Sequence, residues 1–356
     1  MGDPVQSTPL RWRLASEEDE SKLFADDSVV ERHVGQGEFR GMEFLHVNAR
    51  TVVNRVPEVS RVPFRFTINP YRGCSHACTY CFARPTHEYL GLGMGEDFDR
   101  RIVVKVNAVE RLEAELSSRR WQGDHIAMGT NTDPYQKAEG KYHLTQGIIE
   151  VLGEHENPFS ILTKSTLILR DLRLLAKVAR RTDVRVNVSV GTLDREVWKL
   201  SEPGTPPPDK RLEAVRRLNE AGVRCGVLVA PVLPGLSDTN EQLREVAAAC
   251  VAAGAVSVSA IALHLRRGVR AHYLSWLSEV RPDLGPLYAK RFGRSAYQPG
   301  GEQQRITRVV SDAFEEAGGR EPVLEAKSWW WTGLEDASPQ PSGAPRRPEV
   351  EQLSFG

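Results

Sequence analysis

Cysteine and net charge are both scarce in this sequence. Its 356 residues include five cysteines, and Lys plus Arg equal Asp plus Glu at 47 each, so the formal net charge is zero. An odd, small cysteine count argues against a disulfide framework. Zero net charge argues against a strongly basic coat for nucleic acid but is compatible with a local basic groove.

Long apolar runs are also missing. No stretch approaches the roughly 18 apolar residues of a membrane span, and Met1–Leu10 is polar, without the apolar segment of a signal peptide. We therefore expect a protein of the reducing cytoplasm with no membrane partner. The chain is 40% hydrophobic, which is enough for one large domain or two small ones.

Three of the five cysteines lie in one short segment. Cys74, Cys78 and Cys81 have a C-x3-C-x2-C spacing, and three thiolates on one loop can hold three corners of a cubic iron–sulfur cluster. A structural metal site would require a fourth Cys or His nearby, and the spacing of His76 and His87 does not suit that role. One iron would then be open to a small molecule. A structural zinc loop and three unrelated buried thiols are the alternatives.

Composition divides the chain into four predicted parts. Residues 1–45 are rich in charge without a sustained period, which predicts a polar, partly disordered N-terminal arm. Residues 46–285 form the predicted core domain, and residues 286–332 a C-terminal helical extension. Residues 333–356, rich in Pro, Ser and Gly, form a predicted disordered tail.

Strand and helix patterns alternate through the core domain. Asn107 with Glu110, and Thr239 with Gln242, have the spacing of capping boxes at helix starts. The predicted strands cover residues 62–68, 125–130, 159–164, 184–190, 224–232 and 255–263, with a strand-like run over 102–106. The predicted helices cover residues 107–118, 145–155, 171–181, 210–221, 239–253 and 269–280, with an amphipathic helix over 302–317 across the barrel. Six such units predict an α/β fold with parallel strands, either an open doubly wound sheet or an incomplete barrel.

The cysteine segment resembles the radical S-adenosylmethionine (radical SAM) superfamily, including an aromatic residue, Tyr80, before the last cysteine. Two further pieces, G-T-N-T-D-P-Y-Q over residues 129–136 and Thr163-Lys164-Ser165, resemble its spore photoproduct lyase-like branch, which includes a DNA repair enzyme. The resemblance covers about residues 62–280. It implies an incomplete (β/α)6 TIM-type barrel, a [4Fe-4S] cluster on Cys74, Cys78 and Cys81, and SAM bound at the remaining iron.

The resemblance also implies SAM contacts at the strand ends. Thr132 and Asp133 would bind the amino group, and Lys164 with Ser189 the carboxylate. Ala230 opens a turn that would line the adenine and ribose, with Tyr80 beside the cofactor. From the residues alone, an Asp-Pro turn, a solvated lysine and a structural Pro-Gly turn remain open alternatives at Asp133, Lys164 and Ala230.

The resemblance implies a reductive cleavage of SAM to a 5′-deoxyadenosyl radical that abstracts hydrogen from a substrate. A one-electron reductant such as flavodoxin or ferredoxin would then be a partner. Where the repair enzyme has a hydrogen-returning cysteine this sequence has Thr130, and where it has a tyrosine after the cluster this sequence has Phe82. The substrate is therefore unknown, with nucleic acid one candidate. A non-catalytic iron–sulfur and SAM-binding sensor is the alternative function.

Several other residues attract attention. Cys225 and Cys250 lie in a predicted strand and helix and are expected to pack in the core. Arg211 could reach a phosphate or carboxylate, or simply begin a helix. The basic stretch 266–270, with His264 and His272 beside it, could hold an anionic substrate or form a solvated turn. Trp329–Trp331 could stack with bases or plug the barrel, and Gln352–Phe355 vaguely resembles a sliding-clamp-binding peptide.

Overall fold

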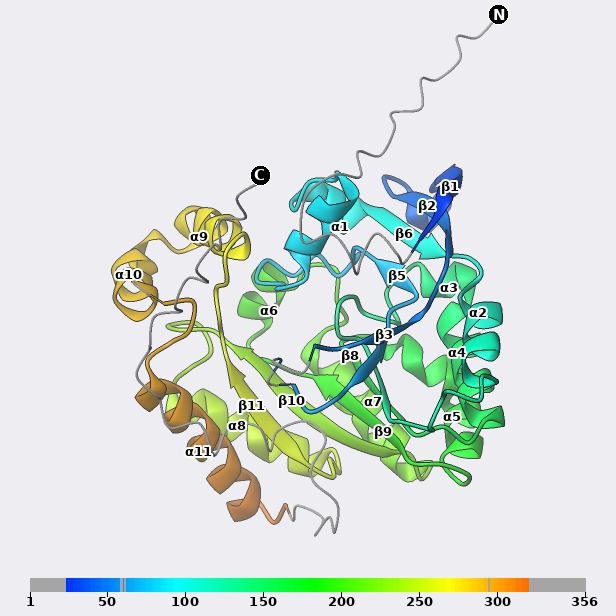
Figure 1. Ribbon diagram of the computed structural model, residues 1–356. Helices are drawn as coiled ribbons and strands as arrows, with labels where there is room; N and C mark the ends of the chain where they lie inside the picture. Colours follow the sequence, from blue (N-terminus) through cyan, green and yellow to red (C-terminus); the bar gives the residue numbers. More distant parts are fainter. Residues whose placement is uncertain (1–23, 58–59, 61, 294, 320–356) are drawn as a thin grey trace, which may run out of the picture.

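A computed structural model describes residues 24–57, 60, 62–293 and 295–319. Its larger sheet contains six parallel strands that curve around a core, with one antiparallel strand beside the first (Figure 1). The order is β11-β10-β9-β8-β7-β4-β3, and each neighbour from β4 to β11 pairs in parallel. The strands are β3 (Val53–Arg55), β4 (Phe66–Ile68), β7 (Ile126–Met128), β8 (Phe159–Thr163), β9 (Val184–Ser189), β10 (Arg224–Val232) and β11 (Val258–Ala262).

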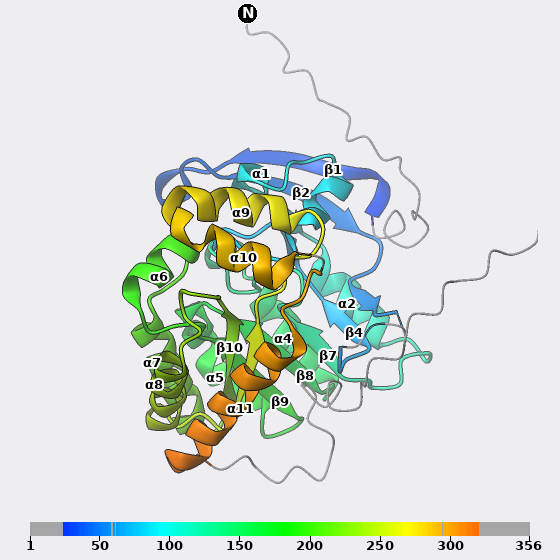
Figure 2. The same cartoon turned by 90° about the vertical axis from the view of Figure 1, so that its left-hand side faces the viewer.

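This arrangement confirms the predicted incomplete barrel. Among the described residues β11 and β3 end the sheet at opposite edges, so the barrel stays open. The helices are α1 (Glu96–Arg100), α2 (Ala108–Leu116), α3 (Glu139–Tyr142), α4 (Leu144–Glu154), α5 (Leu172–Val178), α6 (Arg195–Ser201), α7 (Pro208–Glu220), α8 (Asn240–Ala252), α9 (Val269–Val280), α10 (Gly285–Phe292) and α11 (Gly300–Glu316). Helices such as α4, α5, α7 and α8 cover the outside of the large sheet, whereas α1, α9 and α10 lie beyond the ends of its strands (Figures 1 and 2). Short 3-10 segments are η2 (Gly37–Phe39), η3 (Arg84–Leu90), η4 (Thr166–Asp171) and η5 (Pro282–Leu284).

A second sheet lies beside the barrel, with the order β1-β2-β6-β5. Its strands are β1 (Phe24–Val34), β2 (Glu43–Ala49), β5 (Tyr71–Arg72) and β6 (Arg101–Lys105). The expectation of an irregular arm up to residue 45 is wrong for β1 and the start of β2, because the two strands pair antiparallel. The limits of the four predicted parts remain a prediction.

Two helix starts show how tertiary contacts compete with local signals. The capping box of Thr239 and Gln242 forms at the start of α8, as predicted. Asn107 does not cap α2. Its side chain instead accepts a hydrogen bond from Ala49 N (2.8 Å) and donates one to Ala49 O (3.0 Å), which ties α2 to the end of β2.

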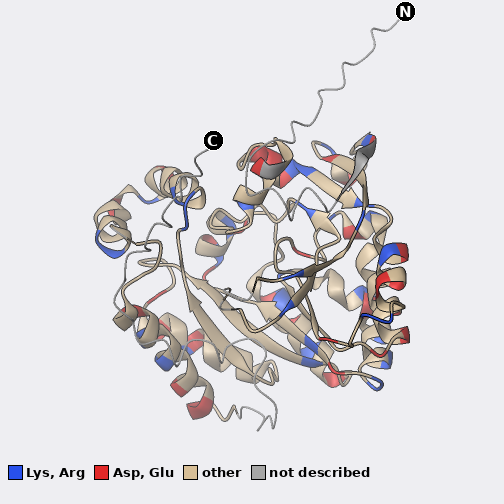
Figure 3. Ribbon diagram, in the orientation of Figure 1, with Lys and Arg blue, Asp and Glu red and all other residues tan. Residues whose placement is uncertain are grey.

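The predicted C-terminal helix forms as α11. It packs against α8 and β11, at one edge of the sheet, rather than across the barrel. Cys225 and Cys250 are fully buried in the main apolar core, as expected. Charges of both signs are interspersed over the outer helices (Figure 3). Within the described residues, no helix has the length and apolarity needed to cross a membrane. The Trp329–Trp331 and Gln352–Phe355 segments lie outside the described residues.

Candidate active site

The cysteine loop begins directly after β5 and makes a tight turn at Gly73. Gly73 has a φ of 77°, and a Cβ there would lie 2.8 Å from Phe98 O, so only glycine fits without strain. Cys74 N then donates to Phe98 O at 2.8 Å. Cys74 and Cys78 are buried and Cys81 is partly exposed, and all three thiols are free. The loop therefore presents three thiols from a fixed backbone.

Residues after β7 brace this loop from the barrel side. Thr132 Oγ1 donates to Gly73 O (2.6 Å), and Gln136 Nε2 donates to the same oxygen (2.9 Å). Gln136 Oε1 accepts from Ser75 N at 3.0 Å. On the other side Arg84 donates twice to Cys78 O, at 3.0 and 2.9 Å. The conformation of the loop is thus set by side chains that do not themselves carry sulfur.

A third support comes from the proline-rich segment before α7. Gly204 N donates to His76 O at 3.0 Å, and a Cβ on Gly204 would lie only 2.1 Å from Ser75 O. Thr79 N donates to Ser201 O at 3.0 Å. This segment therefore touches the cysteine loop through backbone contacts that need a glycine.

Each of the two nearby histidines has one ring nitrogen held by another group. His76 Nδ1 lies 3.3 Å from Asp133 Oδ2, and His87 Nε2 bonds the carbonyl of Arg101 at 2.9 Å. These contacts turn one nitrogen of each ring toward Asp133 and Arg101, and the absence of a fourth protein ligand remains a prediction. A metal cluster on this loop would keep one position free of protein ligands.

The spacing of the sulfur atoms also bears on the metal. Thiolates bound to a single zinc ion at about 2.3 Å would lie ~3.8 Å from one another. The sulfurs of Cys74, Cys78 and Cys81 do not all lie within 4.8 Å of one another, so a single zinc ion would require these side chains to move closer together. Burial raises the pKa of all three thiols, so loading a cluster must displace protons from them.

Asp133 lies where β7 and β8 end. Its Oδ1 accepts from Thr163 Oγ1 (2.7 Å) and Tyr135 N (2.9 Å), and its Oδ2 accepts from Lys164 N (2.7 Å) beside His76. Burial would raise the pKa of the Asp133 carboxyl, but His76 and these donors hold it below its usual value. Four groups therefore face its two oxygens, and in this arrangement the carboxylate joins β7, β8 and the cysteine loop.

The side chain of Lys164 lies where β8, β9 and β10 end. Its Nζ donates to Ser189 Oγ at 2.5 Å and to Ala230 O at 3.3 Å, and Ser189 Oγ donates to Ala230 O at 2.8 Å. Nζ also lies 5.8 Å from the centre of the Tyr80 ring. The structure thus brings together Lys164, Ser189, Ala230 and Tyr80, four of the residues that the sequence proposed for SAM.

A buried acid organises this group. Glu202 accepts from the Tyr80 hydroxyl through Oε1 and from the Arg211 guanidinium through Oε2. Its Oε1 lies 3.7 Å from Lys164 Nζ. Burial would raise the pKa of Glu202, but Arg211, Lys164 and the Tyr80 hydrogen bond lower it to about 2. Lys164 and Arg211 thus share the Glu202 carboxylate, with Arg211 the closer of the two.

Arg211 does reach a carboxylate, and it belongs to the protein. The side chain is 1% exposed, and it also donates to Ser189 O at 3.0 Å and Pro206 O at 2.7 Å. It is therefore not free to bind a ligand. Glu202 was not among the predicted site residues because an acid before a Pro-Gly turn has no local feature that distinguishes it from a surface residue.

Exposed aromatic rings lie next to the cysteine loop. Phe82 is 52% exposed and Tyr297 45% exposed, and the ring of His264 lies between them at 6.1 and 5.7 Å. Arg266 donates to the Tyr297 hydroxyl at 2.8 Å and lies over its ring at 5.8 Å. Arg266, the first residue of the basic stretch 266–270, therefore lies on the same surface as these rings.

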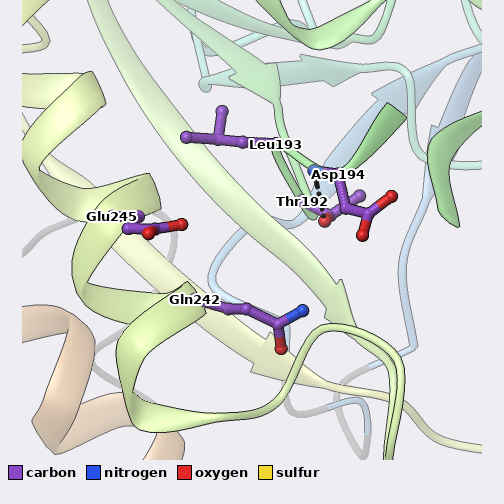
Figure 4. Close-up of a pocket in the computed structure, with 5 residues that line it drawn as sticks. All are labelled: Thr192, Leu193, Asp194, Gln242 and Glu245. Atoms are coloured by element: carbon purple, nitrogen blue, oxygen red, sulfur yellow. Dashed lines mark hydrogen bonds between the residues drawn. The ribbon is translucent and has the colours of Figure 1, made fainter. Parts of the chain in front are cut away.

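A small pocket lies between the residues after β9 and the first turns of α8 (Figure 4). It is lined by Thr192, Leu193, Asp194, Gln242 and Glu245. The Asp194 side chain caps α6, accepting from Glu196 N at 2.8 Å and Val197 N at 3.0 Å. Gln242 belongs to the α8 capping box. These groups serve helix ends, and we assign no ligand to the pocket.

Comparison with known proteins agrees with this geometry. A sequence model described as the radical SAM superfamily matches residues 68–248. An uncharacterized protein of Mycobacterium tuberculosis is 44% identical over 280 residues, covering 79% of this chain and 82% of its own length. Another, of Methanocaldococcus jannaschii, is 29% identical over 200 residues, covering 56% of this chain and 71% of its own.

The fold is also similar to that of solved structures. Spore photoproduct lyase complexed with a dinucleoside spore photoproduct aligns with a TM-score of 0.55 and 20% sequence identity. The alignment covers 77% of this chain and 79% of that chain. At this identity the match shows the fold alone.

Proposed function

The chain belongs to the radical SAM superfamily and is an enzyme, and we propose that it holds a [4Fe-4S] cluster on Cys74, Cys78 and Cys81 and cleaves SAM reductively. When bound and reduced, the cluster supplies the electron that splits SAM into methionine and a 5′-deoxyadenosyl radical able to abstract a substrate hydrogen. The observation that carries this proposal is a braced loop that presents three free thiols beside the Lys164 and Ser189 side chains at the strand ends.

The strand ends would hold the carboxylate of SAM. Arg211 pairs closely with Glu202, whereas Lys164 Nζ lies 3.7 Å from the Glu202 carboxylate, so Lys164 could pair with a further carboxylate. We assign that carboxylate to Lys164 Nζ and Ser189 Oγ, which are already hydrogen-bonded to each other. The Ala230 carbonyl accepts hydrogen bonds from Lys164 Nζ and Ser189 Oγ. Ala230 would therefore place these two groups next to the adenine and ribose of SAM.

The assignment of Thr132 and Asp133 to the SAM amino group remains a prediction. We propose that both residues also position the site. Their present hydrogen bonds support a positioning role, since Thr132 holds the turn at Gly73 and Asp133 holds the backbone at Lys164. Both contacts fix the distance between the cluster thiols and the carboxylate site.

For the substrate we propose nucleic acid with an accessible base. The exposed rings of Phe82 and Tyr297 offer stacking surfaces next to the cysteine loop, and Arg266 adds a cation over one of them. Thr130 bonds Asn69 at 3.2 Å, and its hydroxyl O–H bond is too strong to return a hydrogen atom as a thiol does. We therefore propose a reaction other than the cleavage of a thymine photoproduct.

The cofactor chemistry is tested by 5′-deoxyadenosine formation. Protein with its cluster rebuilt without oxygen would receive SAM and dithionite, which replaces a physiological donor that we expect to be a flavodoxin or ferredoxin in a reducing cytoplasm. The unmodified protein should form 5′-deoxyadenosine, Cys81→Ala should form none, and the core control Cys225→Ala should behave as the unmodified protein. An intact cluster with bound SAM and no 5′-deoxyadenosine, with or without nucleic acid, would favour a SAM-binding sensor instead.

The substrate proposal is tested by binding to a single-stranded oligonucleotide at several salt concentrations. Phe82→Ala should weaken binding by about 1–3 kcal/mol, the value of one base stack. Arg266→Ala should reduce the slope of log affinity against log salt by at most about one. The control is Arg181→Ala, an exposed arginine that is paired with Glu156 and lies just before β9, at the opposite ends of the strands. Equal binding by all variants would exclude this surface.

A further inference from the structure

Three side chains with metal-binding atoms lie together on the β1–β2 hairpin, away from the cysteine loop. In the antiparallel register, Glu31 pairs with His46 and His33 pairs with Phe44. Glu31 and His33 are two residues apart on β1, so their side chains point to the same face of the ribbon. His46 lies directly opposite Glu31, on that face. The register itself therefore gathers one carboxylate and two imidazoles.

The distances between these groups suit a shared ion. His33 Nε2 lies 2.9 Å from Glu31 Oε2, and His46 Nδ1 lies 4.0 Å from the same oxygen. One ligand atom from each residue lies within 4.8 Å of the other two. Nitrogen and oxygen ligands about 2.0–2.2 Å from a tetrahedral zinc ion lie roughly 3.3–3.6 Å apart. Small side-chain adjustments would give that geometry.

The orientation of His46 adds an independent observation. Its Nε2 is hydrogen-bonded to the hydroxyl of Tyr142, on α3, at 2.8 Å, so its Nδ1 is the nitrogen turned toward Glu31. A metal-binding histidine commonly has its second ring nitrogen fixed by a hydrogen bond in this way. Tyr142 thus selects which nitrogen of His46 faces the cluster of ligands.

The surroundings of His33 give another observation. Its Nε2 is shielded from solvent and has no hydrogen-bond partner, because the nearby Glu31 oxygen is not aligned for one. The two imidazole rings are 4.2 Å apart. Both rings therefore lie close enough to Glu31 to face one bound ion together.

A simple ion pair explains these contacts less completely. An ion pair between Glu31 and His33 alone would leave His46 Nδ1, which faces the same Glu31 oxygen at 4.0 Å, without a role. A divalent ion would use all three groups. Two neutral imidazoles and one carboxylate would leave the bound ion with a single net positive charge.

We propose that Glu31, His33 and His46 bind a divalent transition-metal ion, with Zn²⁺ as the best match for two imidazoles and one carboxylate. A fourth position would be filled by water, since Glu31 is exposed at the ribbon surface. The ion would link β1 to β2 at one edge of the smaller sheet (Figure 1). The strand at the opposite edge of that sheet, β5, leads into the cysteine loop. The site does not depend on SAM chemistry.

The test is zinc affinity of the cluster-loaded full chain, measured by competition with a chromophoric chelator without oxygen. The unmodified protein should bind one equivalent of zinc. His33→Ala and His46→Gln should each lower the zinc affinity at least tenfold. Tyr142→Phe should weaken it by up to roughly tenfold. The matched control is His155→Ala, which removes another histidine paired with a glutamate, His155 Nε2–Glu113 Oε1 at 3.0 Å, without a third ligand.

Cobalt supplies a second readout that does not depend on variant folding. Co²⁺ bound to the unmodified protein should show d–d absorption of a nitrogen and oxygen site without thiolate charge-transfer bands. Glu31→Gln, an exposed substitution, should weaken cobalt and zinc binding while 5′-deoxyadenosine formation stays unchanged. Equal zinc binding by the unmodified protein and both histidine variants, or a thiolate spectrum for the bound cobalt, would overturn the proposal.

Discussion

Replacing Glu202 with glutamine should destabilise the protein through the buried pair with Arg211. The pKa of Glu202 is lowered from 4.5 to about 2, which corresponds to about 3 kcal/mol at roughly 1.4 kcal/mol per tenfold change in the ionisation constant. Loss of one partner from a buried ion pair leaves the other charge uncompensated and costs about 3–5 kcal/mol. Both estimates predict a decrease of about 3 kcal/mol in the free energy of unfolding at pH 7, or roughly 4 °C in Tm.

Urea unfolding, followed by far-ultraviolet circular dichroism, measures this change. Because the folded-state pKa is depressed, the carboxylate stabilises fully above pH 4.5, and its contribution declines as pH falls toward 2. The difference between unmodified protein and Glu202→Gln should therefore shrink below pH 4.5. Adding Arg211→Met to Glu202→Gln should recover part of the lost stability. Glu213→Gln, which changes an exposed acid on α7, the helix that carries Arg211, should have no measurable effect. A Glu202→Gln protein as stable as the unmodified one would refute this reasoning.

Three further predictions concern other parts of the site and core. Lys164→Met should weaken SAM binding about 10–100-fold in equilibrium dialysis by removing a charge-assisted hydrogen bond, with iron content unchanged; unchanged affinity would exclude Lys164 from the carboxylate site. Gly204→Ala should lower iron per chain because its Cβ would meet Ser75 O at 2.1 Å, while Gly285→Ala, with open space around it, should not; equal iron content would contradict the close contact. Cys250→Ala should reduce the free energy of unfolding by about 1 kcal/mol through a small core cavity and leave iron content unaltered, and iron loss would show that this thiol is not only a core residue.

The sequence predicted the barrel well because its strands are short apolar runs between recognisable helix signals. The six predicted strands at 62–68, 125–130, 159–164, 184–190, 224–232 and 255–263 all correspond to strands of the large sheet. The strand β1 was missed because a charged strand at the edge of a small sheet has little apolar alternation. Its partner, β2, supplies the pairing that the local pattern does not indicate.

The site was partly predictable for a similar reason. Cys74, Cys78 and Cys81 are close in sequence, so their spacing alone indicates shared chemistry. Glu202 and Gln136 act through contacts with residues about 60 to 120 positions away, Gln136 with Ser75 and Glu202 with Tyr80. Such contacts depend on the order of the strands in the sheet, and no local motif marks them.

The central claim is that the three-cysteine loop holds an iron cluster with one iron open to SAM. Mössbauer spectroscopy of protein loaded with isotopically enriched iron, before and after addition of SAM, tests it most directly. The account predicts a [4Fe-4S] spectrum in which a single iron site changes when SAM binds, and no such cluster in Cys81→Ala. A spectrum that SAM leaves unchanged, although SAM is bound, would contradict the account, as would a loop that binds zinc in place of iron.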